Sequence, residues 1–296
     1  MSAQITTAFV EQFKNNVYLL AQQKGSRLRS CVRNEDITGE TAYFEQIGAV
    51  EAEDITTRHG DSPLMETPHA RRKVTPIDSD WGDLIDKLDK VKMLIDPTSP
   101  YALSAAYALG RRTDDHIITA ATGTAYTGKA GTTSTVLPST QKVAVNLGGS
   151  NIGLTIAKLI AAKSLFGQND VDIDDPINHL YFAVSQQQLD DLLNTTEVTS
   201  ADYNTVRALV KGEVDTFMGF EFKRTERLAL NSSTDVRTCF AWARSGICLG
   251  VNADMQTEIA KRSDKRFSTY VYACMSQGAT RMEEEKVVQV LCDESP

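Results

Sequence analysis

The chain has 296 residues, 41% of them hydrophobic, which is enough for a large core and excludes a protein that is disordered throughout. Its formal net charge of −8 and its pI near 5.1 argue against a dedicated nucleic-acid-binding protein, because such a protein needs a basic face to neutralise phosphates. No run of about 18 uncharged apolar residues occurs, which argues against a membrane-spanning helix.

The first predicted element is an amphipathic helix over residues 5 to 23, whose apolar side chains recur at helical spacing. Gly25 is a typical residue for its C-terminal end. Before this helix there is no basic region followed by an apolar run, so we expect no secretory signal. The apolar positions of the helix are Phe9, Phe13, Val17 and Leu20.

Residues 34 to 80 form a long polar segment that cannot build a core of its own. From residue 34 to 61 the only base is Arg58, and it stands against eight acids: Glu35, Asp36, Glu40, Glu45, Glu51, Glu53, Asp54 and Asp61. After several turn residues the basic stretch 69–73 follows, with Arg71, Arg72 and Lys73. Partial alternation over residues 50–53 predicts an extended hairpin leg. Within a compact domain such a segment is a functional lid, a disordered linker or an arm ordered by a neighbour.

Two helices are predicted after this segment. Apolar residues from Trp81 to Val91 recur at a helical period, and Pro97 ends that helix. Ser99 and Pro100 then resemble an N-cap and a first-turn proline, and an alanine-rich stripe continues to Thr122. At about 1.5 Å per residue this second helix would be roughly 30 Å long, enough to form the spine of a domain.

The remaining chain alternates between short helices and strands. Residues 123–140 predict a low-complexity loop. Strands are predicted at 143–145, 180–184, 217–222, 239–251, 267–276 and 287–292, and helices at 151–165, 186–193, 206–214 and 253–262. Helices mixed with largely antiparallel strands favour an α+β fold over a doubly wound parallel sheet.

The five cysteines are an odd number at wide spacings, without a CxxC pair or a nearby histidine at zinc-finger distance. We therefore expect reduced and mostly buried thiols in a protein made in a reducing cytoplasm. These cysteines are Cys31, Cys239, Cys248, Cys274 and Cys292.

Three motifs come close to known chemistry without completing it. Residues 123–129 match GxxxxGK of a phosphate-binding loop, but Ala130 replaces the Ser or Thr that holds magnesium, and the flanking elements are wrong. Residues 147–153 follow a predicted strand and open a predicted helix, where backbone amides could bind a phosphate, but Ser150 replaces the second glycine of GxGxxG. They favour a tight turn with Ser150 or Asn151 as N-cap. Residues 170–175 begin like a calcium loop, yet Tyr181 stands where the last acidic ligand belongs, which favours an acidic surface loop.

No catalytic arrangement is visible among the other candidate groups. The four histidines are scattered, and no paired carboxylates or activated nucleophile stand out. We therefore predict no catalytic residue, no cofactor and no metal ligand. An enzyme that binds a nucleotide through residues 123–129 is the remaining alternative from a different class.

Four local patterns follow one another along the chain, at residues 94–101, 108–118, 217–222 and 270–288. Each pattern alone is weak, and their joint order is moderately specific. Taken in order, they resemble the major capsid proteins of tailed bacteriophages with the Hong-Kong-97-type fold. The resemblance extends over nearly the full length.

The resemblance implies four parts of the fold. They are an N-terminal arm at 1–33, an extended hairpin loop at 34–80, a peripheral domain with the spine helix at 81–130 and 253–296, and an axial domain at 131–252. It also implies a subunit that assembles through hexamers and pentamers into an icosahedral shell around double-stranded DNA. That DNA would be enclosed without sequence-specific binding, in a virion assembled in the host cytoplasm, and without a membrane.

Further partners and one alternative follow from the same resemblance. Any scaffold would be a separate protein or a region already removed, because the first predicted helix begins near Ile5. Separate portal and decoration proteins are further expected partners. An encapsulin-type compartment shell resembles this fold and stays open as an alternative. Some family members cross-link a hairpin lysine, but this segment contains only Lys73, so we do not transfer that chemistry.

The candidate functional residues are the charges of the extended segment. If it lies across a neighbouring subunit, its acidic outgoing leg and basic return leg would make head-to-tail contacts whose charges set the register. Reversing the charges of the basic leg is then expected to leave a folded subunit that assembles poorly. The predicted contact residues are Glu51, Glu53, Asp54, Arg58, Arg71, Arg72 and Lys73.

Overall fold

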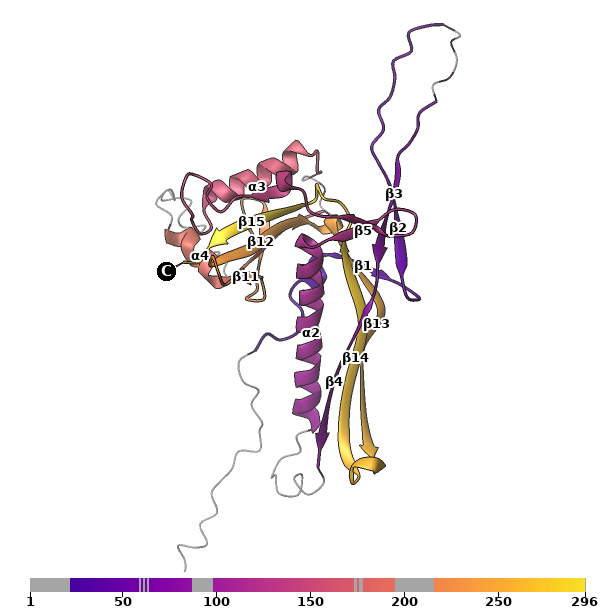
Figure 1. Ribbon diagram of the computed structural model, residues 1–296, viewed down its shortest axis with the longest axis vertical. Helices are drawn as coiled ribbons and strands as arrows, with labels where there is room; N and C mark the ends of the chain where they lie inside the picture. Colours follow the sequence, from indigo (N-terminus) through magenta and orange to yellow (C-terminus); the bar gives the residue numbers. More distant parts are fainter. Residues whose placement is uncertain are drawn as a thin grey trace, which may run out of the picture.

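The computed structural model describes residues 22–86 except 59, 61 and 63, residues 98–172, residue 175, and residues 178–194 and 216–295. One long helix stands beside a long, narrow sheet, a wider sheet lies across the upper end of both, and an extended loop leads away from the body (Figure 1). Helices mixed with mostly antiparallel strands confirm the predicted α+β class.

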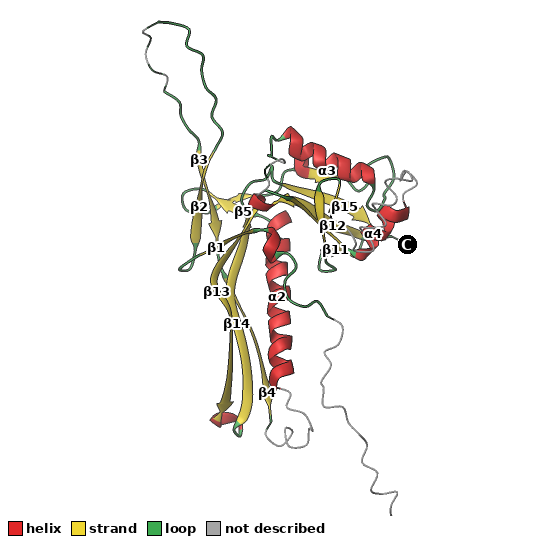
Figure 2. Ribbon diagram, turned by 180° about the vertical axis from the view of Figure 1, so that it is seen from behind, coloured by secondary structure: helices red, strands yellow, loops and turns green. Residues whose placement is uncertain are grey.

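The long sheet has the strand order β1-β13-β14-β4, with β1 parallel to β13 and the other pairs antiparallel. Helix α2 (Thr98–Thr122) lies along one face of this sheet, as both views show (Figures 1 and 2). Ala105 and Leu109 of the helix are buried against Ala273 and Met275. The predicted spine helix is therefore present. The strands are β1 (Arg33–Asp36), β4 (Ile77–Ile85), β13 (Ile247–Arg262) and β14 (Ser268–Arg281).

Two predicted helices were wrong and are strands of this sheet. Trp81 and Ile85 share one face at strand spacing as well as at helical spacing, and pairing with β14 selects the strand. Residues 253–262 are good helix formers, but they belong to β13, which pairs with β14 as far as Arg262. Tertiary pairing overrides local propensity in both cases. The rest of the helix predicted to start at Trp81, residues 87–97, lies outside the described residues.

At the upper end of the long sheet, two glycines of the central strands β13 and β14 face each other, and other segments of the chain pass close to them. Gly250 pairs with Gly278. A Cβ on Gly278 would lie 2.3 Å from the carbonyl oxygen of Thr75, and one on Gly250 would lie 2.9 Å from the Cδ1 of Ile37. The chain just before β4 can therefore cross β14 only over a residue without a side chain.

Gly278→Ala is expected to lower the free energy of unfolding by about 1–3 kcal/mol, because the new methyl group overlaps a backbone oxygen that cannot swing away. Urea denaturation of the unassembled subunit measures this loss. The control is Gly167→Ala, where a Cβ meets nothing within 4 Å. Equal stabilities of the two variants would contradict the close approach.

A seven-stranded sheet contains most of the core. Its order is β7-β15-β12-β8-β10-β9, and β11 pairs with β12 at the side. The closing strand β15 thus belongs to this sheet together with β7 to β12, although it follows β14 in the chain. The strands are β7 (Lys142–Val143), β8 (Leu180–Val184), β9 (Thr216–Phe217), β10 (Phe220–Arg224), β11 (Leu230–Asn231), β12 (Val236–Ala243) and β15 (Val287–Asp293).

Helices α3 (Ile156–Gln168) and α4 (Gln186–Asn194) lie against this second sheet (Figure 1). The predicted N-cap at Ser150 or Asn151 was wrong, because Thr155 caps α3 and accepts a hydrogen bond from the Lys158 amide at 3.4 Å. The helix predicted at residues 206–214 lies outside the described residues. The core between helices and sheet is aromatic, with fully buried Phe166, Phe182, Phe220, Phe240 and Trp242.

All five cysteines are free, and four of them are buried, which confirms the expectation of unpaired, mostly buried thiols. Burial raises the pKa of Cys248 to about 12, so this thiol stays protonated at neutral pH. Among the helices that the structure describes, none is both long and apolar enough to span a membrane.

Candidate functional site

The extended segment starts from a small third sheet of order β2-β3-β5-β6. Strands β2 and β3 pair antiparallel from Ala42↔Val74 to Ile47↔His69, and the Gly48 amide closes the ladder with a 2.9 Å hydrogen bond to the Pro68 carbonyl. Beyond this point the chain makes a long loop that leads away from the body and back (Figure 1). The strands are β2 (Ala42–Ile47), β3 (His69–Val74), β5 (Ala125–Thr127) and β6 (Thr133–Thr135).

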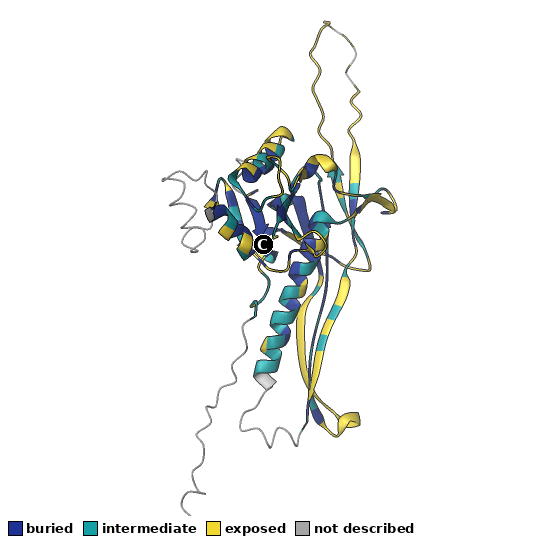
Figure 3. Cartoon of the chain, turned by 60° about the vertical axis from the view of Figure 1, so that its left-hand side comes forward, coloured by how far each residue is buried: buried dark blue, intermediate teal, exposed yellow. Residues whose placement is uncertain are grey.

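The loop between β2 and β3, residues 48–68, is exposed at every position that the structure describes (Figure 3). We call it the arm loop. Its predicted contact residues Glu51, Glu53, Asp54 and Arg58 form no ion pair with any described residue. Ile55 is 95% exposed and Leu64 is 92% exposed. Charged and large apolar side chains are therefore exposed to solvent together, and the described part of the subunit does not cover them.

The three basic side chains of β3, those of Arg71, Arg72 and Lys73, differ in their surroundings. Arg71 is on the surface, pairs with Glu45 across the ladder and lies 5.5 Å above the Tyr43 ring. Lys73 is half-buried and faces Gly131, where a Cβ would come within 2.6 Å of the Lys73 Cδ. Arg72 points inward and is only 7% exposed.

Arg72 belongs to a buried ionic cluster at the base of the arm loop. Its Nη2 donates to Glu284 Oε2 at 2.5 Å, and its Nε donates to the Met282 carbonyl at 2.8 Å. Arg281, fully buried, lies 3.5 Å from the second Glu284 oxygen. Arg72 therefore ties β3 to the end of β14, and reversing its charge would disturb the subunit itself. The predicted reversal of the whole basic leg thus cannot test assembly alone.

Arg281 extends the same cluster to the spine helix. Its Nη1 donates to the carbonyls of Ala121 at 3.1 Å and Gly123 at 2.7 Å, and its Nη2 donates to that of Thr135 at 3.1 Å. Burial lowers the pKa of the guanidinium, and Glu284 opposes this shift. One carboxylate and two guanidinium groups thus join the arm loop's base, the end of α2 and the end of β14.

The sequence motifs that approached chemistry do not form sites. Residues 123–129 run from the end of α2 into β5, and β5 turns back into β6 through Gly128 at φ +89°. A phosphate loop needs a helix N-terminus after it, whereas a strand follows here. The second glycine motif contains a turn with Gly148 and Gly149 at positive φ, and α3 begins only at Ile156, seven residues after Gly149.

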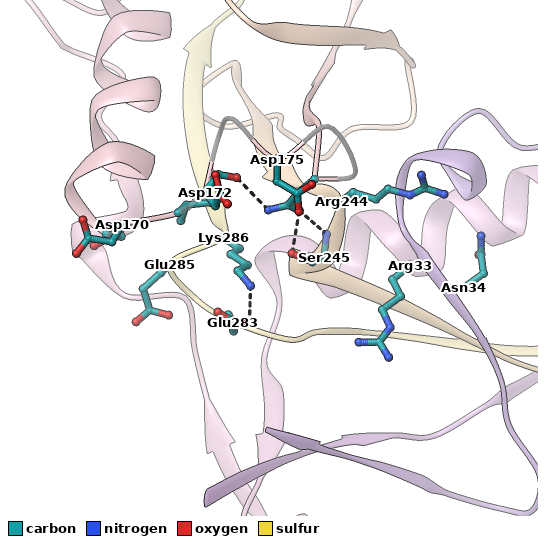
Figure 4. Close-up of a pocket in the computed structure, with 13 residues that line it drawn as sticks. Arg33, Asn34, Asp170, Asp172, Asp175, Arg244, Ser245, Glu283, Glu285 and Lys286 are labelled. Carbon is teal, nitrogen blue, oxygen red and sulfur yellow. Dashed lines mark hydrogen bonds and ion pairs between the residues drawn. The ribbon is translucent and has the colours of Figure 1, made fainter. Parts of the chain in front are cut away.

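A hollow of about 770 Å³ lies beside the predicted acidic loop (Figure 4). Several of its polar groups contact one another: Lys286 pairs with Glu283 at 2.7 Å, and Asn178 accepts hydrogen bonds from the Ser245 amide and hydroxyl at 3.1 and 2.9 Å. Over the described residues, no three His, Cys, Asp or Glu side chains come together as a metal site.

A second group of exposed charges was missed in the sequence. The tip of the β13–β14 hairpin carries Lys261, Arg262, Lys265 and Arg266 within six residues of an acidic chain. Phe267, which follows them, is 63% exposed. We call residues 261–267 the basic tip. The density of bases was a usable signal, but the erroneous helix at 253–262 concealed that a hairpin would present them.

A family model described as phage capsid protein matches residues 5–294. Solved structures with a similar fold include the capsid subunits of Helicobacter pylori bacteriophage KHP40 (9% identity, TM-score 0.74, 100% of this chain and 99% of that one) and Cyanophage Pam1 (14%, 0.73, 97% and 97%). The capsid of Ralstonia phage GP4 is also similar (10%, 0.71, 97% and 96%). No curated protein matches the sequence.

Proposed function

The chain belongs to the phage capsid protein family, and from this premise we propose that it assembles through hexamers and pentamers into an icosahedral shell around double-stranded DNA. Its fold is the Hong-Kong-97-type capsid fold, and it is a structural component of the virion rather than an enzyme. Family membership disfavours both the encapsulin-type shell and the nucleotide-binding enzyme.

The observation that carries the assembly proposal is the fully exposed arm loop. Ordering the chain there costs conformational entropy, and the described residues of the subunit offer the loop no contact that offsets this cost. A neighbouring copy does. Because loop and body are different surfaces, such a contact is heterologous and can close into rings. Each subunit then both gives and receives an arm loop, so that weak contacts accumulate through multivalency.

The residues proposed for this contact are the charges of the arm loop and its base. Glu51, Glu53, Asp54 and Arg58 have no partner in the described chain, and Arg71 and Lys73 lie at the base. Arg72 has a structural role within the subunit instead. Exposed charges of this kind set approach and register more than net affinity.

We propose the predicted division of the chain with two adjustments. The predicted parts are an N-terminal arm at 1–33, an extended loop at 34–80, a peripheral domain at 81–130 with 253–296, and an axial domain at 131–252, and the adjustments concern residues 77–85 and 287–293. The pairing of β4 with β14 supports placing all of residues 77–85 in the peripheral domain. The pairing of β15 with β12 supports placing residues 287–293 in the axial domain.

The other proposed partners are the packaged DNA and further proteins of the shell. A subunit with net charge −8 stays soluble before assembly in the host cytoplasm and does not grip packaged DNA tightly. Scaffolding, portal and decoration proteins would join the shell as separate chains.

Replacing residues 49–67 by Asn-Gly tests the arm loop directly. Gly48 and Pro68 are already hydrogen-bonded across the ladder, so a two-residue turn can join them without moving β2 or β3. The subunit is expected to keep its unfolding temperature, because the loop is exposed, and to lose assembly. Electron microscopy and size-exclusion chromatography measure the particles, and thermal denaturation checks the fold. Shells of normal yield from the shortened chain would contradict the proposal.

A further inference from the structure

We propose that the arm loop's acidic stretch, Glu51 to Asp54, docks on the basic tip of another copy of the chain. This inference rests on the proposed function and names the surface that receives the arm loop. The acids of the arm loop and most of the bases of the tip form no ion pair with the described residues, and the two surfaces are opposite in charge.

The basic tip keeps most of its charge unpaired. Arg262 forms an ion pair with Asp264 at 2.7 Å and lies 5.5 Å above the Tyr270 ring. Lys261, Lys265 and Arg266 are exposed and form no ion pair with the described part of the chain. Three free positive charges thus concentrate at one end of a molecule whose net charge is −8.

The backbone of the tip is strained at its most apolar residue. Arg266 has φ 52° and Phe267 has φ 59°, both in the left-handed region that bulky residues avoid. Phe267 is nevertheless 63% exposed, so the subunit gains little burial from this conformation. Strain kept without an internal benefit is typical of a site with an external one.

The two surfaces lie at opposite ends of the molecule. The arm loop points away from the upper end of the long sheet, and the β13–β14 tip forms its lower end (Figures 1 and 3). One chain therefore cannot bring them together, whereas a second copy placed head to tail can. The arm loop also offers the exposed apolar side chains Ile55 and Leu64 to Phe267. Charge and apolar surface thus both fit a second copy as the occupant.

Matched charge reversals test the pairing. The arm variant is Glu51→Lys with Glu53→Lys, and the tip variant is Lys261→Glu with Lys265→Glu. The control, Glu40→Lys with Glu285→Lys, makes the same charge change as the arm variant at exposed sites elsewhere. Each of the first two variants is expected to reduce the shell yield about tenfold, because like charges then face each other. The control should assemble like the wild type.

A chain carrying both reversals is decisive, because every contact then regains opposite charges in swapped positions. Recovered shell yield supports the pairing. Failure of this chain to recover, or normal assembly of the tip variant alone, overturns it. If only the arm variant fails, the arm loop binds a different surface and the proposed function survives. If the wild-type chain forms no shells, the proposed function fails instead.

Phe267→Gly separates contact from folding. Glycine adopts φ 59° without strain, so the subunit's unfolding temperature should not fall. The shell yield should fall nonetheless, because the apolar contact is lost. Unchanged assembly of this variant would remove Phe267 from the docking surface, and the inference would lose its apolar part.

Discussion

Glu284→Gln is expected to lower the free energy of unfolding of the subunit by about 3–5 kcal/mol, because it leaves two inward-facing guanidinium groups without their counter-charge. The side chain of Arg72 is 9% exposed and that of Arg281 is fully buried, so water cannot replace the lost carboxylate. Gln can still accept one hydrogen bond, but it carries no charge. Urea denaturation of the unassembled subunit at neutral pH measures the loss.

The neighbouring residue supplies a matched control. Glu285 is exposed, so Glu285→Gln should change the stability by no more than about 0.5 kcal/mol. A loss below about 1 kcal/mol for Glu284→Gln would mean that the two arginines find other partners. The ionic cluster would then not be what holds β3, the end of α2 and the end of β14 together.

The cluster also links stability to the placement of the arm loop. Glu284 holds Arg72 of β3, while Gln46 of β2 donates to the same Met282 carbonyl, at 2.8 Å, that Arg72 contacts. Hydrogen exchange at the amides of β2 and β3 should therefore rise in the Glu284→Gln variant. The base of the arm loop would then move more freely even in the fraction of molecules that stay folded.

Much of the fold could be predicted from local pattern. The spine helix ends at Thr122 as predicted and begins at Thr98, two residues before the predicted Pro100, and β8 lies at residues 180–184 as predicted, because these elements are long or fully apolar. The failures at β4 and β13 share a cause. Both strands pair with β14, which follows β4 much later in the chain and is joined to β13 by a hairpin. Their hydrogen-bond partners therefore lie outside the short window on which a local sequence pattern depends.

The candidate site divides in the same way. The exposure of Glu51, Glu53 and Asp54 follows from a segment that is too polar to build a core. The burial of Arg72 could not be predicted, because its partner Glu284 lies 212 residues away. Charge count alone placed Arg72 with Arg71 and Lys73, although alternate residues of a strand face opposite sides.

Asp114 is the second residue at which a large effect is expected. This fully buried carboxylate on α2 accepts hydrogen bonds from the backbone amides of Arg27 and Leu28, each at 3.1 Å, and from the Ser26 hydroxyl at 2.5 Å. It thereby fixes the segment before β1 against the spine helix. The close approach needs Gly110 on α2, where a Cβ would lie 2.6 Å from the Cα of Gly25.

That segment also joins the two main sheets. The Cys31 carbonyl accepts a hydrogen bond from the buried Trp242 indole at 2.9 Å, and β1 then pairs with β13. Loss of Asp114 therefore loosens the junction between the seven-stranded sheet, the spine helix and the long sheet together.

Asp114→Ala is accordingly expected to lower the free energy of unfolding by about 3–5 kcal/mol, because at least two backbone amides lose a charged acceptor worth about 1.5–3 kcal/mol each. Asp114→Asn should fall between this variant and the wild type, since its amide oxygen still accepts. Hydrogen exchange at Arg27 and Leu28 should rise in the same order.

The adjacent acid distinguishes this role from a general charge effect. Asp115 pairs with Arg227 at the surface, so Asp115→Ala should cost no more than about 1 kcal/mol. If Asp114→Ala and Asp115→Ala proved equally mild, the amides at residues 27 and 28 would have found water or other acceptors. In that case Asp114 would not be what holds the segment on α2. The close approach at Gly110 would hold it there instead.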